Sequence, residues 1–308
     1  MSPLLAIDWG TSRARAYLVG DDGGVIARNA SEDGIQKVPA GGFPAAYQRL
    51  VAPLLALAPD ALPVFAGMVG SRNGWQEVGY LPCPASLNDF SAALVPVDAA
   101  GQPGWLVPGL SCEGVAFDVM RGEETLAFGA GVTDGLICLP GTHSKWVEMQ
   151  AGRITRFASF MTGEVFGLLR HQSILSRLAE PDASADEDAR ADLMFQQGLR
   201  TTGQAGGWLH HAFAARTQVL SERLAPSHVG AYLSGLLIGH EIAGAQALFG
   251  DHDKVTLVAE GEVCANYAVA LGAHMQVNIR DPEEAFVAGI GVIIRQSSRQ
   301  SLLQAVTS

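Results

Sequence analysis

The chain has 308 residues, of which 48% are hydrophobic and 17% are charged, and it contains 36 glycines. This composition is typical of a globular, turn-rich protein with enough length for two domains, and it excludes a disordered chain. The formal net charge of −11 argues against nucleic acid or an anionic membrane as the partner, because both require a basic face. A small anion is still a suitable ligand, since a few arginines and backbone amides can bind it.

The four cysteines are widely separated and lack the close spacing of metal ligands or of a disulfide framework. We expect them to be free thiols. The first residues do not form the basic and apolar segments of a secretion signal, so we expect a cytoplasmic protein. The longest apolar stretch, residues 229–250, is interrupted by His240 and Glu241, which favours a buried helix over a membrane span.

Residues 4–19 predict a β-hairpin with a polar tip. Four apolar residues run into Asp8, the turn Gly10-Thr11-Ser12 follows, and residues 13–19 alternate as a strand does. One interpretation is a phosphate site, in which the three amides of the turn converge on an anion and Asp8 holds Mg²⁺. The other is an ordinary hairpin, in which Asp8 and Thr11 only satisfy the turn.

The first half continues with a predicted turn at 21–24 into a third strand at 25–29, a helix at 43–58 and a strand at 63–66. The glycine-rich segment 67–75 follows that strand directly, where open α/β sheets bind their ligands. The alternative for this segment is a surface loop with one packed tryptophan.

A further short strand is predicted at 105–110, and residues 118–129 are typical of a loop that opens a helix. Glu123 and Glu124 would lie in the first turn of that helix. Acidic residues there stabilise the helix dipole, so they are either capping residues or a catalytic carboxylate.

The second half begins by repeating the first. Residues 136–149 are again an apolar strand, a Gly-Thr tip and an alternating strand, and a turn then leads to a strand at 154–160. Gly141-Thr142 matches Gly10-Thr11, so we expect a duplicated domain with the two tips facing a cleft. The second copy has Leu139 in place of Asp8.

Mostly helical segments complete the chain. Residues 180–192 are acidic and are expected to be an exposed connection, and Glu260-Gly261-Glu262 is expected to turn into a helix. The predicted helices are 164–178, 193–215, 229–250, 263–271 and 283–295, with one strand at 254–259.

The chain resembles the sugar kinases of the actin, hexokinase and Hsp70 superfamily, and within them the 2-dehydro-3-deoxygalactonokinase family. The resemblance covers nearly the whole chain and is carried in order by the segments AIDWGTSRARAYL, GMVGSRNGW, DVMRGEET, LPGTHSKWVEM, FMTGEVFGLL and YLSGLLIGHEI.

The resemblance implies an α/β fold of two ribonuclease-H-like, actin-like domains with a cleft between them. Residues 1–130 would form the sugar and Mg²⁺ side, and residues 131–308 the nucleotide side. It implies ATP-dependent phosphorylation of the 6-hydroxyl of 2-dehydro-3-deoxy-D-galactonate in galactonate and galactose breakdown, and it suggests a homodimer. The alternatives are a kinase for another sugar acid or ketose, and a non-sugar actin-like ATPase module.

The same resemblance implies roles for single residues. Asp8 would hold Mg²⁺, and the general base would be Glu123, with Glu124 second and Asp8 as a further alternative. Lys145 would add positive charge near the phosphates, although a lysine after a turn is more often solvated. Phosphates and nucleotide would contact Gly10, Thr11, Ser12, Gly141, Thr142, His143 and Gly261. The carboxylate of the sugar acid calls for an arginine, either Arg72 or Arg121, with Asn73 and Trp75 shaping the sugar pocket.

Overall fold

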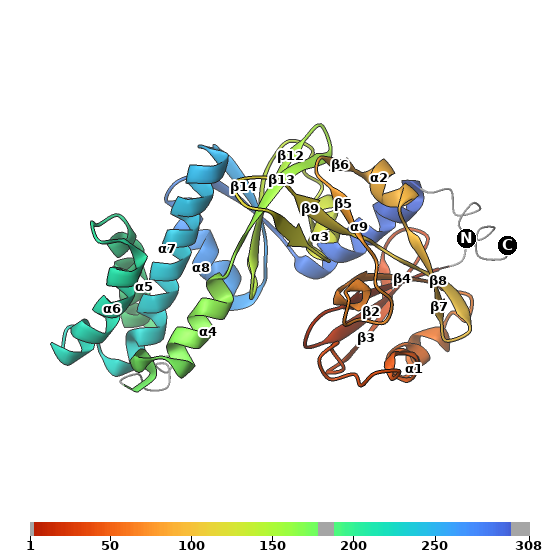
Figure 1. The fold of residues 1–308 in the computed structure, drawn as a ribbon, viewed down its shortest axis with the longest axis horizontal. Coiled ribbons are helices and arrows are strands. Elements are labelled where there is room, and N and C mark those ends of the chain that lie inside the picture. The colour runs from red at the N-terminus through yellow and green to blue at the C-terminus, as the bar shows by residue number, and fades with distance from the viewer. Residues whose placement is uncertain (1–2, 178–187, 297–308) are drawn as a thin grey trace. The chain divides into compact units, whose positions relative to one another are not determined.

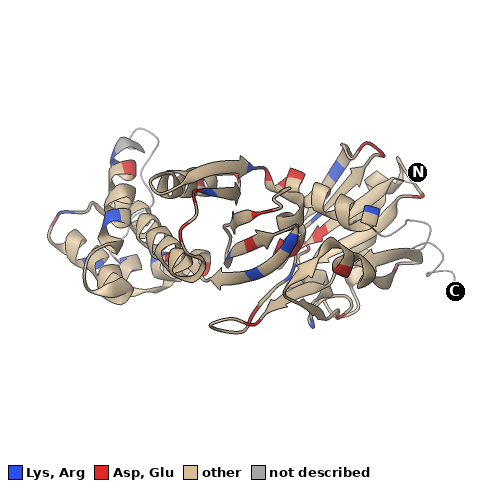
Figure 2. Cartoon of the chain, turned by 90° about the horizontal axis from the view of Figure 1, so that it is seen from above, with Lys and Arg blue, Asp and Glu red and all other residues tan. Residues whose placement is uncertain are grey.

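The computed structural model describes residues 3–177 and 188–296, which fall into two compact units (Figure 1). Unit 1 combines the chain up to Ile137 with Val147–Phe157 and the segment from Arg280. Unit 2 combines Cys138–Trp146 with Ala158–Ile279. Lys and Arg residues are dispersed over the elements of both units and do not gather on a single helix or strand of the described chain (Figure 2).

The first sheet of unit 1 has the strand order β3-β2-β1-β4-β8-β7. Its strands are β1 (Leu4–Trp9), β2 (Ala14–Val19), β3 (Val25–Ser31), β4 (Leu62–Gly67), β7 (Val95–Ala99) and β8 (Gln102–Leu106). The predicted hairpin and third strand are confirmed, since β1, β2 and β3 pair antiparallel. Strand β4 runs parallel to β1, so the last residue of each strand lies at one edge of the sheet.

Aromatic side chains fill the core between this sheet and helix α1 (Phe43–Leu55). Trp75 contacts four other rings, with centroid distances of 5.7 to 6.3 Å. The four partners are Trp9, Phe43, Tyr47 and Phe65. These contacts anchor the loop that follows β4, and they agree with the alternative of a loop with one packed tryptophan.

A second, small sheet of unit 1 has the order β10-β9-β5. It consists of β5 (Tyr80–Pro82), β9 (Gly109–Cys112) and β10 (Asp118–Met120). The predicted single strand over 105–110 is therefore wrong: its first part belongs to β8 and its last part to β9, in different sheets. Pro108 lies between them and has no N–H to donate to a strand partner.

Helices α2 (Leu87–Ala92), α3 (Glu123–Gly129) and α9 (Pro282–Gln296) also belong to the described part of unit 1. Helix α3 follows β10 directly and packs on α9, which also contacts α2. The predicted C-terminal helix is confirmed by α9.

The third sheet repeats the order of the first. Its strands run β15-β14-β11-β12-β13-β6, so β13-β12-β11-β14-β15 corresponds to β3-β2-β1-β4-β8. This match confirms the predicted duplication. Strands β11, β12 and β13 each contribute residues to both units. The bounds are β6 (Ala85–Ser86), β11 (Gly135–Leu139), β12 (Ser144–Gln150), β13 (Arg153–Phe160), β14 (Lys254–Val258) and β15 (Gln276–Arg280).

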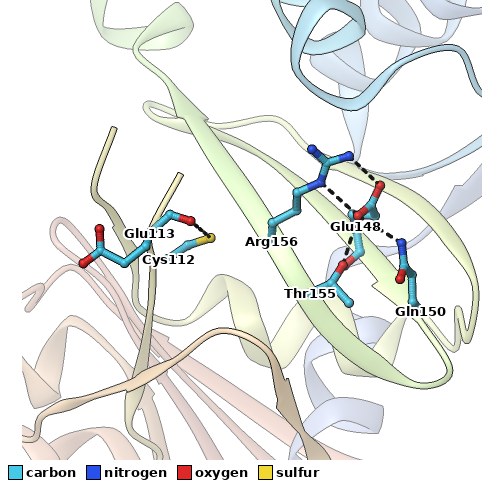
Figure 3. A network of polar contacts seen from close by, with 6 residues as sticks. All are labelled: Cys112, Glu113, Glu148, Gln150, Thr155 and Arg156. Carbon is cyan, nitrogen blue, oxygen red and sulfur yellow. Dashed lines mark hydrogen bonds and ion pairs between the residues drawn. The ribbon is translucent and has the colours of Figure 1, made fainter. Parts of the chain in front are cut away.

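In unit 1, β12 and β13 are joined by a buried carboxylate, Glu148 (Figure 3). Its two oxygens accept hydrogen bonds from Nε and Nη2 of Arg156, each at 2.9 Å. The hydroxyl of Thr155 donates to the same carboxylate at 3.1 Å. These contacts raise the pKa of Arg156 and fix the register of the hairpin.

Helix α7 (Val229–Phe249) is the central element of unit 2 and contacts α4 (Thr162–Gln172), α5 (Asp188–Thr202), α6 (Gly207–Leu220) and α8 (Gly261–Gly272). It is buried along most of its length, as its apolar sequence predicts. No described helix has the length and apolar character needed to cross a membrane. The predicted helix over 193–215 is divided between α5 and α6, because Gly203 and Gly206 interrupt it. The expected acidic connection at 180–192 lies mostly outside the described residues.

Candidate functional site

Asp8 lies at the end of β1 and faces Arg15 on β2, with 3.6 Å between Oδ2 and Nη1. About one third of its side chain reaches solvent, but protein surrounds the carboxyl on its other sides. Burial raises the pKa of Asp8 from 3.8 to about 6; the negative charge of Glu123 adds to this rise, and Arg15 opposes it. Asp8 and Glu123, far apart in sequence, therefore form one electrostatic cluster.

Two glycines bring backbone close to this cluster. Gly67 ends β4 with φ +93°, and Gly122 precedes α3 with φ +106°. A methyl group on Gly67 would lie 3.4 Å from Oδ1 of Asp8, and one on Gly122 would lie 3.2 Å from the Cα of Gly67. Only glycine adopts these conformations without strain and leaves room for such contact. Gly67 thus lies against the carboxyl of Asp8, and Gly122 lies against Gly67.

The two glutamates at the start of α3 have different surroundings. Glu124 is fully buried, and both of its oxygens accept the N–H of Gly122, at 2.9 and 2.7 Å. Burial and the neighbouring Glu123 raise its pKa to about 8. Glu123 is partly exposed and accepts the N–H of Arg121 at 3.0 Å. Of the two, only Glu123 is open to a substrate.

Arg121 is an unusual buried cation, with a relative exposure of 8%. Its Nη2 donates to the carbonyl of Val78 at 2.6 Å, and its guanidinium lies over the ring of Tyr80, 4.4 Å from the ring centre. Its Nε and Nη1 are buried and have no hydrogen-bond partner among the described residues. A buried charge with unused donors is costly unless an anion accepts from them.

Arg72 and Asn73, the other residues expected near the sugar, lie on the surface of the loop after β4. Arg72 is 86% exposed and lies 3.6 Å from the exposed carboxylate of Glu77, a pair of the kind that contributes little to stability. Of the two candidate arginines, Arg121 is therefore the one whose surroundings point to a ligand.

The first tip, Gly10-Thr11-Ser12, is held by its own backbone and by the segment after β3. The N–H of Gly10 donates to the carbonyl of Arg13 at 2.9 Å, so this amide is already used within the turn. Thr11 and Ser12 are exposed and remain the candidates for binding an anion. Gly34 lies directly beneath them: a methyl group there would lie 2.2 Å from the carbonyl carbon of Ser12.

The second tip lines a cavity of about 810 Å³ in unit 2, a volume suited to a nucleoside or another small ligand. Gly163, at the start of α4, packs against this tip, since a methyl group on it would lie 2.4 Å from the carbonyl oxygen of Gly141. The walls come from the second tip, α4, α5, α7, α8 and the 3-10 helix η4 (Pro226–His228) before α7. The polar lining residues are Thr142, Thr162, Asp192, Ser227, Ser234, Glu262, Asn266 and Tyr267.

His143 and Lys145 follow the second tip. Nε2 of His143 contacts the carboxylate of Glu164 on α4, and both side chains are partly exposed. Lys145 is only 4% exposed, so it is not solvated; its ammonium donates to the carbonyl of His143 at 3.2 Å. Gly261 begins α8 with φ +61° and is exposed, and its neighbour Glu262 lines the cavity.

Sequence reasoning missed the residues that support the site. Gly34 and Gly163 lie against the two tips, Gly67 lies beside Asp8, and Gly122 lies against Gly67. A signal for Gly67, Gly122 and Gly163 was present, because each lies in a segment that resembles a family motif. The cavity wall gave no local signal, since its helices are distant in sequence.

The fold defines the class of protein first. The activator of the 2-hydroxyisocaproyl-CoA dehydratase from Clostridium difficile, solved with bound ADPNP, superposes with a TM-score of 0.55, 11% identity and 97% of each chain covered. A xylulose kinase from Lactobacillus acidophilus superposes with a TM-score of 0.51 and 9% identity over 99% of this chain and 92% of that one. The chain thus has the two-domain, actin-like α/β fold of sugar kinases and ATPases, as expected.

Sequence comparison then gives the family. The family model for 2-keto-3-deoxy-galactonokinase matches residues 8–293. A probable 2-dehydro-3-deoxygalactonokinase from Rhizobium meliloti (strain 1021) is 36% identical, covering 94% of this chain and 96% of the relative. The 2-dehydro-3-deoxygalactonokinase of Escherichia coli (strain K12) is 34% identical, and the match covers 93% of this chain and 95% of that relative. A provisionally named 2-dehydro-3-deoxygalactonokinase from Sinorhizobium meliloti has a solved structure that superposes with a TM-score of 0.85 and 34% identity. The superposition covers 95% of this chain and 98% of that chain. The chain belongs to the 2-keto-3-deoxy-galactonokinase family.

Proposed function

We propose that this chain transfers the γ-phosphoryl group of ATP to the 6-hydroxyl of 2-dehydro-3-deoxy-D-galactonate. Membership of the 2-keto-3-deoxy-galactonokinase family supports a sugar-acid kinase. We further propose that unit 1 binds the sugar acid and that unit 2 binds the nucleotide, because the carboxylate cluster and Arg121 lie in unit 1 and the cavity lies in unit 2.

The buried guanidinium of Arg121 is the observation that supports a sugar acid as the substrate. Its unused Nε and Nη1 would donate to the carboxylate of a sugar acid, and charge-assisted hydrogen bonds of this kind are strong. A neutral ketose offers no charge to balance the buried cation. This feature favours an acid over a ketose as the acceptor.

Asp8 suits Mg²⁺. The described residues contain no group of three or more His, Cys, Asp or Glu that could hold a metal ion, so a protein-only cage is not expected here. Mg²⁺ in kinases takes one or two carboxylates and obtains its other ligands from water and phosphate, which the partly exposed carboxyl of Asp8 allows. When bound, the ion would neutralise charge on the transferring phosphate.

Glu123 is the proposed general base. Its carboxylate is partly exposed, lies at the start of α3 and interacts with the charge of Asp8. It would accept the proton of the attacking hydroxyl, while the amides of Thr11 and Ser12 bind phosphate oxygens. Glu124 is sealed from solvent and is proposed to hold Gly122 in place.

The cavity of unit 2 is the proposed nucleotide site. Gly141 and Thr142 would contact phosphate oxygens, with the ammonium of Lys145 adding positive charge nearby. Asp192, Glu262 and Asn266 offer acceptors and a donor for the ribose and the base.

The experiment is a kinase assay of the purified full chain with ATP, Mg²⁺ and a panel of 2-keto-3-deoxy acids and ketoses, reading ADP release and the phosphorylated product. We expect phosphorylation of the galacto epimer and not of the gluco epimer or of ketoses. ATP hydrolysis that no sugar changes would refute the kinase proposal and favour a non-sugar ATPase.

A further inference from the structure

Glu241 is a buried carboxylate of unit 2. It lies in the middle of α7 and is 2% exposed. Trp146 Nε1 donates to its Oε1 at 2.8 Å, and the hydroxyl of Tyr267 donates to its Oε2 at 2.7 Å. Burial raises the pKa of Glu241, and these hydrogen bonds oppose the rise.

The hydroxyls of Ser144 and Thr162 also interact with Glu241, and both lower its pKa. The hydroxyls of Ser144 and Tyr267 also lie 3.1 Å apart. The four donors come from three elements, namely β12, α4 and α8. The side chain of Glu241 therefore links β12 to α8, which are separated in sequence by more than a hundred residues.

Two of these donors, Thr162 and Tyr267, line the 810 Å³ cavity. Thr162 begins α4 beside Gly163, which packs against the second tip. Tyr267 lies on α8 next to Asn266, another lining residue. Glu241 itself is not among the residues that line the cavity, but it contacts these two residues that are.

We infer that Glu241 is a positioning residue for nucleotide binding: from the core it fixes Thr162 and Tyr267, and so sets the wall of the cavity at α4 and α8. The inference rests on the proposed function in assigning the nucleotide to this cavity. A carboxylate suits the task because it accepts several hydrogen bonds at once and has no donor of its own to satisfy.

The test compares Glu241→Leu with Glu241→Gln in the full chain. In the leucine variant the indole N–H and the tyrosine hydroxyl lose their acceptor. The glutamine oxygen can still accept from Trp146, while Tyr267 turns its hydroxyl toward Ser144. The measurements are calorimetric binding of ATP without sugar acid, the KM for each substrate, kcat and the melting temperature.

We expect Glu241→Leu to weaken ATP binding about tenfold or more, the size of effect produced when buried donors lose their acceptor. The KM for the sugar acid should not change, and Glu241→Gln should recover most of the ATP binding. Glu148→Leu is the matched control: it removes a buried carboxylate of unit 1 and should lower the melting temperature without changing ATP binding.

Unchanged ATP binding by folded Glu241→Leu would overturn the inference, as would an equal rise in both KM values or an equal effect of Glu148→Leu. If Glu241→Leu does not fold, Tyr267→Phe and Thr162→Val each remove one contact, and wild-type ATP binding by both would likewise overturn it. A wild-type chain that binds no ATP would instead refute the proposed nucleotide site.

Discussion

Gly122 lies against Gly67, such that a methyl group on Gly122 would come within 3.2 Å of the Gly67 Cα. This contact joins the start of α3 to the end of β4, next to Asp8. It places Glu123 close enough to the carboxyl of Asp8 for the two charges to interact. A single methyl group added to Gly67 or Gly122 would therefore disturb the site.

Gly122→Ala should therefore reduce both stability and activity. The residue has φ +106°, where an alanine is strained by about 1–3 kcal/mol, and the added methyl group also crowds Gly67. Gly131→Ala is the control, because it has φ +71° with nothing within 4 Å of its methyl position. Chemical denaturation and kcat measure the two effects. Equal losses in both variants would show that backbone strain alone is responsible.

Glu123→Gln should lower kcat strongly, whereas Glu124→Gln should not. A lost general base typically costs about 10²–10⁴-fold in rate. The glutamine at position 124 keeps an oxygen that accepts the N–H of Gly122, so the start of α3 stays intact. Steady-state kinetics with saturating ATP measure the difference. A large fall in kcat for Glu124→Gln alone would assign the base to Glu124.

The protein without ligands should become less stable as the pH rises, because of Glu124. Its carboxyl loses a proton near 4.5 in the unfolded chain but only near about 8 in the folded one. Between these values the folded state holds the extra proton, so stability falls with rising pH, by an amount on the order of a few kcal/mol. Urea unfolding of the wild type and of Glu124→Gln at about pH 5 and about pH 8 measures this linkage. The same pH dependence in both proteins would contradict the assignment.

Arg121→Lys should raise the KM for the sugar acid far more than Arg72→Ala does. A lysine keeps the charge but loses the planar guanidinium that stacks on Tyr80 and presents several donors. The exposed side chain of Arg72 forms an ion pair with the exposed carboxylate of Glu77. Substrate titration at fixed ATP gives both values. A larger effect at Arg72 would move the carboxylate site to the loop after β4.

Asp8→Asn should remove most turnover while the fold persists. The amide keeps the shape of the side chain at the end of β1 but loses the charge that binds Mg²⁺. Glu32→Gln, at an exposed ion pair with Arg13, serves as the control and should keep its activity. Circular dichroism checks folding, and a Mg²⁺ titration of activity checks the role. An Asn variant with wild-type turnover would refute the metal assignment.

The sequence by itself determined that a strand, a Gly-Thr tip and two further strands occur in both halves, because apolar periodicity and the Gly-Thr tips are local patterns. The order in which the other strands join each sheet came from the structure. Motif resemblance similarly determined the family. Trp105 to Leu110 shows the limit of local patterns: its residues are apolar throughout, but whether they form one strand or two depends on the sheets that receive them.

Only the tertiary structure decided which of several similar residues has which surroundings. Arg72 and Arg121 are alike in sequence, but one is exposed and paired while the other is buried with unused donors. Glu123 and Glu124 are adjacent, but helix geometry points one toward solvent and the other into the core. Burial and electrostatic surroundings depend on chain segments that are distant in sequence, so no local pattern could have distinguished these residues.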